Sequence, residues 1–293
     1  MAKILFVGNG LIRALGGNSW DDLLKSLSIR EDFDYDDMHS PMPLRAVLLS
    51  NNTVEPVVEK FSNNTNSALY GGSGRQLRIP LQSMKTAGIT DIITTNYSYE
   101  IEKALLNADS LSRSQISALQ SASYGRAEPK YCIRTYNKAG DVNIWHIHGE
   151  ARKKTSILLT HSSYCRFLYN IQKYLSDKFK SYQSDPFFLE GNRKSWLDMF
   201  ILDDVFIMGF GYDFSEMDLW WLIQKKSQQP NRGRTIFFEP EDIERQKEKV
   251  ELLKIFGVEI ESLGYSVTGK SRKERTTIYK AFYNDVIKYI SES

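Results

Sequence analysis

The chain has little cysteine, little net charge and no long apolar run, and each absence excludes a class of protein. Two cysteines in 293 residues cannot form a disulfide framework or a four-cysteine zinc module. A formal net charge of +2 gives no electrostatic reason to expect binding to nucleic acid or to a membrane surface.

No stretch of the sequence approaches the ~20 apolar residues that a membrane-spanning helix requires. The apolar run at Lys3–Val7 ends at Gly8 and is too short for the core of a signal peptide. With 41% hydrophobic and 25% charged residues, the composition is that of an ordinary globular protein. We therefore expect a soluble, cytoplasmic protein.

Apolar, β-prone runs alternate with segments of helical spacing along the whole chain. This alternation predicts an α/β fold, with a Rossmann-like, doubly wound and mostly parallel sheet. No convincing linker interrupts the pattern, so we expect a single domain over residues 1–293, with helical insertions at 107–130 and 162–200. The central strands are expected at Lys3–Val7, Asp91–Thr95, Asp204–Met208, Thr235–Phe238 and Val258–Ser262.

Five other segments carry weaker patterns. Tyr131–Tyr136 and Val142–Ile147 flank a turn-like stretch and predict a hairpin. Ser156–Leu159 is typical of a short strand, residues 28–45 of a loop, and Asn51–Leu69 of a helix.

Polar or glycine residues follow several of these strands. The first strand leads into Gly8-Asn9-Gly10, the second into Asn96, the hairpin into His148, and a later strand into Gly209-Phe210-Gly211-Tyr212-Asp213. The carboxyl ends of parallel strands meet at one edge of the sheet, where open α/β folds bind ligands. The residue types suggest a nucleotide site that carries chemistry.

The first glycine segment allows the backbone to approach a pyrophosphate, since Gly8 and Gly10 stand one residue apart after a strand. The third glycine of the dinucleotide fingerprint is absent, and Arg13 stands in its place. A plain tight turn remains an alternative for this segment.

Asn96 and His148 are the candidate reactive residues. The Asn96 amide can both donate and accept, which suits a ribose hydroxyl or a water, although an asparagine also satisfies many turns. His148 precedes Gly149, where the strand emerges, and a pKa near neutrality suits a general base. His146 lies two residues deeper and is expected to be structural.

A metal site is not expected at the His-x-His pair. His146 and His148 share one face of a strand, but a metal needs further ligands. His161 is the only nearby third candidate, and no carboxylate cluster accompanies it in the sequence.

The segment after Met208 is a second candidate for a phosphate- or ribose-facing loop, because a strand, a glycine turn and a helix follow one another. The alternative is a well-capped helix start, which Asp213 and Asp218 would suit.

The ordered set of motifs resembles the sirtuin-like family of prokaryotic antiphage defence effectors, from residue 3 to about residue 223. Asn9 between two glycines also resembles the related abortive-infection AbiH proteins. The motifs are Gly8-x-Gly10, Thr94-Thr95-Asn96-Tyr97 with Glu100 and Glu102, His146-x-His148-Gly149-Glu150, Leu159-Thr160 with Tyr164, and Gly209-x-Gly211-Tyr212-Asp213.

The resemblance implies a Rossmann-type domain that binds NAD+ as its substrate and cleaves the nicotinamide–ribose bond. Asn96 and His148 match the catalytic asparagine and histidine of the family, whereas Ser98 stands where the family usually has aspartate. The residues implied to contact NAD+ are Gly8, Asn9, Gly10, Thr95, Gly209, Gly211 and Asp213.

The implied function is that of an NAD+ hydrolase in antiphage defence, which depletes NAD+ on infection. The lack of a zinc module removes support for protein deacylation. The resemblance further implies a homo-oligomer or a partner such as a HerA-type ATPase. The alternatives are a non-hydrolytic NAD or ADP-ribose-binding regulatory or assembly module, favoured by Ser98, and an NAD-dependent oxidoreductase, which the incomplete glycine fingerprint disfavours.

Overall fold

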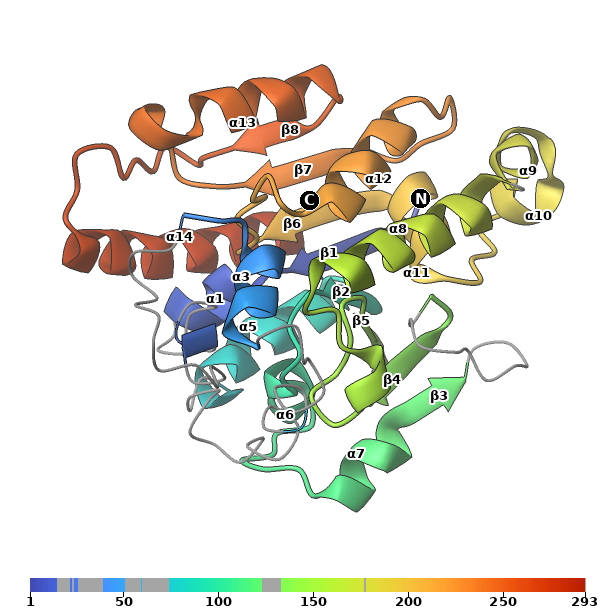
Figure 1. Ribbon diagram of the computed structural model, residues 1–293, viewed down its shortest axis with the longest axis horizontal. Coiled ribbons are helices and arrows are strands. Elements are labelled where there is room, and N and C mark those ends of the chain that lie inside the picture. Colours follow the sequence, from blue (N-terminus) through green and yellow to red (C-terminus); the bar gives the residue numbers. More distant parts are fainter. Residues whose placement is uncertain are drawn as a thin grey trace.

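A computed structural model describes residues 1–14, 22, 24–25, 39–50, 59, 74–122, 133–176 and 178–292. Within these ranges one eight-stranded sheet carries helices on both faces (Figure 1). The strands are β1 (Lys3–Val7), β2 (Asp91–Thr94), β3 (Gln120–Ala122), β4 (Thr135–Ala139), β5 (Val142–His146), β6 (Asp204–Met208), β7 (Thr235–Phe238) and β8 (Glu259–Glu261).

The strands are arranged in the order β3-β4-β5-β2-β1-β6-β7-β8. The six from β5 to β8 run parallel, and β4 pairs antiparallel with both β3 and β5. This confirms the predicted α/β Rossmann-like fold. The winding direction reverses between β1 and β6, which is the switch point where such sheets bind ligands.

Helices of the described ranges have the following bounds: α1 (Asn9–Ala14), α3 (Met42–Leu49), α5 (Gly74–Thr86), α6 (Glu100–Leu105), α7 (Arg113–Leu119), the 3-10 turn η2 (Lys154–Ser156), α8 (His161–Ser176), α9 (Phe179–Ser184), α10 (Pro186–Leu189), α11 (Trp196–Leu202), α12 (Met217–Ser227), α13 (Ile243–Ile255) and α14 (Arg272–Glu292).

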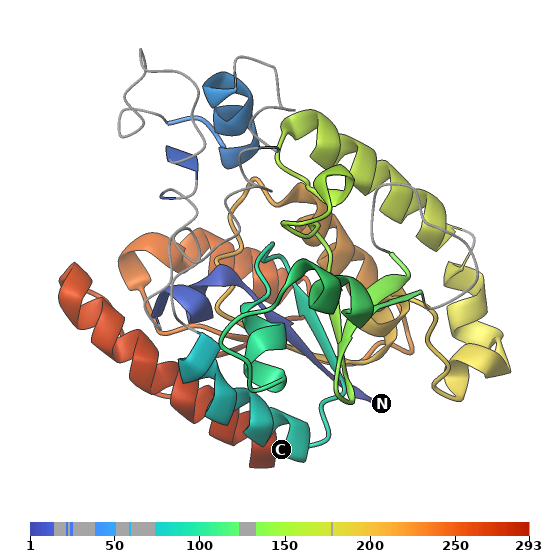
Figure 2. The same ribbon diagram turned by 90° about the horizontal axis from the view of Figure 1, so that it is seen from below.

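The central strands are mostly apolar because both faces of the sheet are buried. In β1, Phe6 points into the core under α8, α11 and α12, whereas Leu5 and Val7 point into the core under α5 and α14. Figure 2 shows α5 and α14 side by side on one face and α8 on the other. Each fully buried side chain of this size contributes about 1.5–3 kcal/mol.

The expected strand bounds hold at β1, β6 and β7, and β2 is one residue shorter than expected. The hairpin is displaced: β4 covers Thr135–Ala139 rather than Tyr131–Tyr136. Gly140, with φ of +66°, supplies the left-handed residue of a two-residue turn, so the strand can continue to Ala139.

Two further expectations were wrong. Ser156–Leu159 is not a strand: Ser156 ends the 3-10 turn η2, and the residues after it form no sheet ladder. Residues 42–45 are not loop, because α3 begins at Met42 with a proline in its first turn, a position that tolerates the missing N–H. The helix expected at Asn51–Leu69 lies outside the described residues except at position 59.

The segment 107–130 contains α7 and the unexpected strand β3, and residues 123–130 of it lie outside the described part of the chain. The segment 162–200 lies in helices α8 to α11 and their connections.

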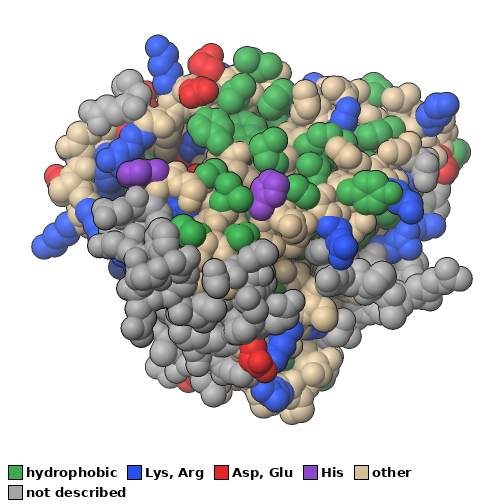
Figure 3. Space-filling view, in the orientation of Figure 1, with side chains coloured by type: hydrophobic (Ala, Val, Ile, Leu, Met, Phe, Trp, Pro, Cys, Tyr) green, Lys and Arg blue, Asp and Glu red, His purple; other side chains and the backbone are tan. Residues whose placement is uncertain are grey.

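Among the described helices, none has the length and apolarity needed to cross a membrane. On the face in Figure 3, Lys and Arg side chains are scattered rather than gathered into one patch, in line with the small net charge.

Candidate functional site

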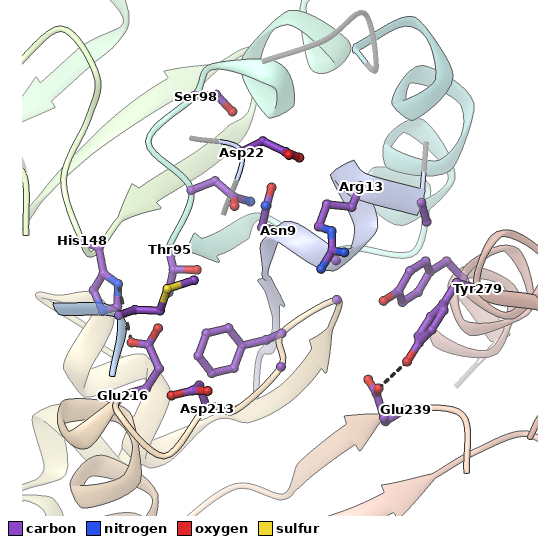
Figure 4. Close-up of a pocket in the computed structure, with 18 of the residues that line it drawn as sticks. Asn9, Arg13, Asp22, Thr95, Ser98, His148, Asp213, Glu216, Glu239 and Tyr279 are labelled. Carbon is purple, nitrogen blue, oxygen red and sulfur yellow. Dashed lines mark hydrogen bonds and ion pairs between the residues drawn. The ribbon is translucent and has the colours of Figure 1, made fainter. Parts of the chain in front are cut away.

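A cavity of about 590 Å³ opens at the carboxyl edge of the parallel strands. It spans the switch point, since its walls come from the segments after β1, β2, β5, β6 and β7 and from α14 (Figure 4). Of the residues singled out from the sequence, it brings together Asn9, Gly10, Thr95, Asn96, His148, Gly209, Gly211 and Asp213.

The glycines after β1 and β6 allow their two loops to touch. The Gly8 N–H donates to the Met208 carbonyl at 3.0 Å, and the Gly10 N–H donates to the Gly209 carbonyl at 2.6 Å. A Cβ atom at Gly8 would overlap the Gly209 carbonyl, and one at Gly10 would approach it to 2.7 Å. Gly8 does not line the cavity. Its role in the structure is to let the loop after β1 pack against the loop after β6.

Asn96 lines the cavity, and the nitrogen of its side-chain amide is unpaired among the described residues. Its backbone N–H is held by Thr94 Oγ1 at 3.1 Å, and its side chain is only 7% exposed. The side-chain Nδ2 has no hydrogen-bond partner among the described residues. A buried donor without a partner costs about 1–3 kcal/mol, which a ligand that accepts its hydrogen bond would offset.

His146 holds Asn96 from below. Its Nδ1 donates to the Asn96 carbonyl at 2.6 Å, and its Nε2 lies 2.7 Å from Glu102 Oε1. Burial opposes the charged ring, but Glu102 and Glu150 outweigh it and raise the pKa of His146 to about 9. His146 is therefore an imidazolium that fixes the loop carrying Asn96, in a more specific role than support of the strand.

His148 is clamped by an acid from another part of the chain. Its Nε2 lies 2.9 Å from Asp218 Oδ2, and its Nδ1 lies 3.4 Å from the Tyr164 hydroxyl and 4.0 Å from Glu216 Oε2. Burial opposes its charge, but Asp218 and then Glu216 outweigh that effect, so the pKa of His148 is raised. The raised pKa makes His148 a stronger base.

Glu216 is the third member of this group. Burial first and then Asp218 and Asp213 raise the pKa of its carboxyl to about 7, against the opposing effect of His148. Ligand atoms of His148, Glu216 and Asp218 lie within 4.8 Å of one another, close enough for these residues to hold a metal ion. The sequence predicts no carboxylate cluster near the histidines, whereas the fold places Glu216 and Asp218 beside His148.

The loop after β6 and the first turn of α12 contain three residues with different roles, Gly211, Asp213 and Asp218. Asp213 accepts from the Ser215 N–H and hydroxyl at 2.9 and 2.6 Å and so shapes the turn before α12. Asp218, which its sequence position suggested as a cap, instead contacts His148. Gly211 lines the cavity with no atom within 4 Å of where its Cβ would lie.

Sequence reasoning missed Glu216, Asp218 and Glu239 as site residues. Asp218 and Glu216 occur in the loop-helix segment that was singled out, but helical spacing alone does not say which side chain turns inward. Glu239 follows β7 directly, and its place at a strand end was the one available signal.

The fold and the cavity define a Rossmann-like α/β protein with a site at its switch point. Residues 90–260 match the model of the SIR2-like domain, which is more than half of the chain, and the chain belongs to this SIR2-like family. No curated protein matches the chain. Membership in this family is consistent with an NAD-related activity.

Proposed function

We propose that the protein is an NAD+ hydrolase of an antiphage defence system, which releases nicotinamide and ADP-ribose and depletes NAD+ on infection. The observation that carries this proposal is that Asn96 and His148 line the same cavity. The Asn96 Nδ2 has no hydrogen-bond partner among the described residues, and His148 is held by the Asp218 carboxylate. Family membership supplies NAD+ as the expected substrate.

The proposed reaction breaks the bond between nicotinamide and the ribose anomeric carbon through an oxocarbenium-like state. Nicotinamide leaves with the bonding electron pair and becomes neutral, so no general acid is required. Asn96 holds the ribose or the attacking water, and His148 accepts the proton that water loses. Asp218 orients the imidazole and stabilises its charged form.

The test is nicotinamide release from NAD+ by the purified protein and by Asn96→Ala and His148→Ala. We expect each variant to lose at least about 100-fold in rate. His161→Ala is the matched control, since His161 is exposed and lies outside the cavity wall. Absence of turnover in every assembly state, or full activity in both cavity variants, would contradict the proposal.

A second candidate is a non-hydrolytic NAD or ADP-ribose-binding module. Ser98 favours it, because this serine lines the cavity where the resemblance leads one to expect an aspartate. Calorimetric binding of NAD+ together with product analysis that finds no nicotinamide would select this candidate.

We further propose that activity is regulated by self-assembly or by a partner such as a HerA-type ATPase. A free NAD+ hydrolase would exhaust the host cell, so it has to be held inactive until infection. Turnover measured across protein concentration, with and without the co-expressed partner, tests this. A rate per chain that changes with neither variable would exclude regulation by assembly.

A further inference from the structure

Three buried oxygen atoms beside His148 take no part in the proposed bond cleavage. Tyr212 Oη, Glu216 Oε2 and Asp218 Oδ1 have no hydrogen-bond partner among the described residues. Tyr212 and Asp218 are each 1% exposed. Burial first, and then the charges of Asp218 and Glu216, raise the pKa of Tyr212, so its hydroxyl lies within electrostatic reach of both acids. Buried oxygens are normally paired with a donor or a cation, and these three are available to one.

The same group has more negative than positive charge. Neither Glu216 nor Asp218 forms an ion pair with a lysine or an arginine of the described residues, and their positive partner is His148. Hydrolysis requires this imidazole to be neutral, and the two acids then lose that partner. A bound cation would supply the missing positive charge.

The three side chains lie close enough together to bind one ion. Asp218 Oδ2 is 2.9 Å from His148 Nε2, and one ligand atom from each of His148, Glu216 and Asp218 lies within 4.8 Å of the others. Zinc binds nitrogen and oxygen at about 2.0–2.2 Å, which puts neighbouring ligand atoms about 3–3.5 Å apart. The pair of Asp218 and His148 already has this spacing.

Glu216 reaches the same spacing by a side-chain shift of about 1 Å. Its side chain is 19% exposed and lines the cavity beside His148, which leaves room for this shift (Figure 4). An ion can therefore enter from the cavity and meet all three ligands.

The donor set selects the class of ion. Zinc accepts an imidazole nitrogen together with carboxylate oxygens, and three protein ligands leave a fourth position for water. Mg²⁺ prefers an all-oxygen set and retains its waters, so the histidine disfavours it.

We propose that His148, Glu216 and Asp218 form an inhibitory zinc site, at which the ion competes with hydrolysis for His148. Zinc binding stands on the geometry of the three ligands, whereas its inhibitory effect rests on the proposed function. The ring nitrogen that binds zinc gives up its lone pair, and the other nitrogen of the neutral ring carries the proton. Neither nitrogen can then accept a proton from water.

Calorimetry measures binding of zinc chloride to the full chain after treatment with a chelator, and magnesium chloride serves for comparison. We expect one zinc ion per chain and at least about 100-fold weaker binding of magnesium. Glu216→Gln and Asp218→Asn each replace a carboxylate by an amide of the same shape. We expect zinc binding to weaken at least about 100-fold in both. Glu216 is partly exposed, so its variant keeps the test available if Asp218→Asn fails to fold.

Two controls separate this site from binding elsewhere on the surface. Glu248→Gln makes the same chemical change at an exposed position of α13 and should leave zinc binding unaltered. His161→Ala removes a rival pair on α8, where Cys165 Sγ lies 3.8 Å from His161 Nδ1, and it should also leave zinc binding unaltered.

Nicotinamide release gives the second readout. With zinc at saturation we expect the rate to fall at least about 100-fold and to return when a chelator is added. An unchanged rate at saturating zinc overturns the inhibitory role.

No zinc binding by the wild type, unchanged binding in a folded Glu216→Gln, or loss of binding in His161→Ala overturns the site and leaves the proposed hydrolysis intact. Zinc binding that depends on Glu216 and Asp218, without nicotinamide release before or after chelation, supports the site and overturns the proposed hydrolysis.

Discussion

Asp218 Oδ2 lies 2.9 Å from His148 Nε2, although 70 residues separate the two in the chain. The contact joins the end of β5 to the first turn of α12. It assigns one ring nitrogen to a buried carboxylate and leaves the other, Nδ1, facing Glu216 and the Tyr164 hydroxyl. The histidine is therefore oriented before any substrate arrives.

Replacement of Asp218 by asparagine should impair the reaction while preserving the fold. The amide removes the charge that raises the pKa of His148, and it can present a donor to Nε2 and so favour the wrong tautomer. We expect nicotinamide release to fall about 100-fold or more. Steady-state kinetics measure the loss, and a near wild-type rate with an intact thermal unfolding curve would rule out an orienting role.

The pH dependence of turnover should reflect both acids. The proposed reaction needs neutral His148, so we expect the rate to rise with pH through the pKa of this histidine, which lies above the usual 6.5. Glu216→Gln removes the smaller of the two charge effects and should move the rising limb to lower pH. Asp218→Asn should move it further. Rate profiles from pH 5 to 9 show the order, and identical midpoints would contradict it.

The imidazolium of His146 should make stability depend on pH. Its folded pKa is about 9 against an ordinary 6.5. The folded state therefore holds this proton more tightly, and the stabilisation is complete below about pH 6.5 and is lost as the pH rises through 9. We expect the difference in unfolding free energy between wild type and His146→Gln to shrink over that range, on the order of 1–3 kcal/mol.

Denaturant titrations at several pH values measure this difference. His161→Gln is the control, because its side chain is exposed. A constant difference between wild type and His146→Gln from pH 6.5 to 9 would show that folding does not raise the pKa of His146.

The two glycine loops should respond differently to alanine. In Gly8→Ala the new methyl group meets the Gly209 backbone, which cannot withdraw without disturbing β6, so we expect about 1–3 kcal/mol of destabilisation. Gly211→Ala places a methyl group in open space and should leave the unfolding midpoint unchanged while weakening ligand binding. Equal melting temperatures for both variants would mean that the loops separate without cost.

The sheet was predictable because its central strands are buried on both faces and therefore contain apolar runs, as at residues 4–7 in β1, 205–208 in β6 and 236–238 in β7. β3 was missed for the opposite reason. Gln120–Ala122 has no apolar run, and it is a strand only because β4 pairs with its backbone. The residues of β3 therefore do not themselves predict its pairing with β4.

The site was predictable to the same extent. Asn96 and His148 follow parallel strands, and parallel strands end at one edge, so their meeting follows from topology. The contact between His148 and Asp218 does not follow from the topology, because it depends on the orientation of the first turn of α12 relative to the sheet. The contact between the loops at Gly8 and Gly209 was equally hidden, since each loop has a plausible pattern of its own.

The helix α14 gives the site a dependence on the order of synthesis. The matched family segment, residues 90–260, contains Asn96 and His148, but Asn9 and Arg13 precede it and Tyr279 and Tyr283 follow it in the cavity wall. The first and last helices of the described chain, α1 and α14, contact each other. A nascent chain therefore contains Asn96 and His148 before the rest of the cavity wall has been synthesised. The cavity is complete only once the segment of α14 has been synthesised and has docked against α1.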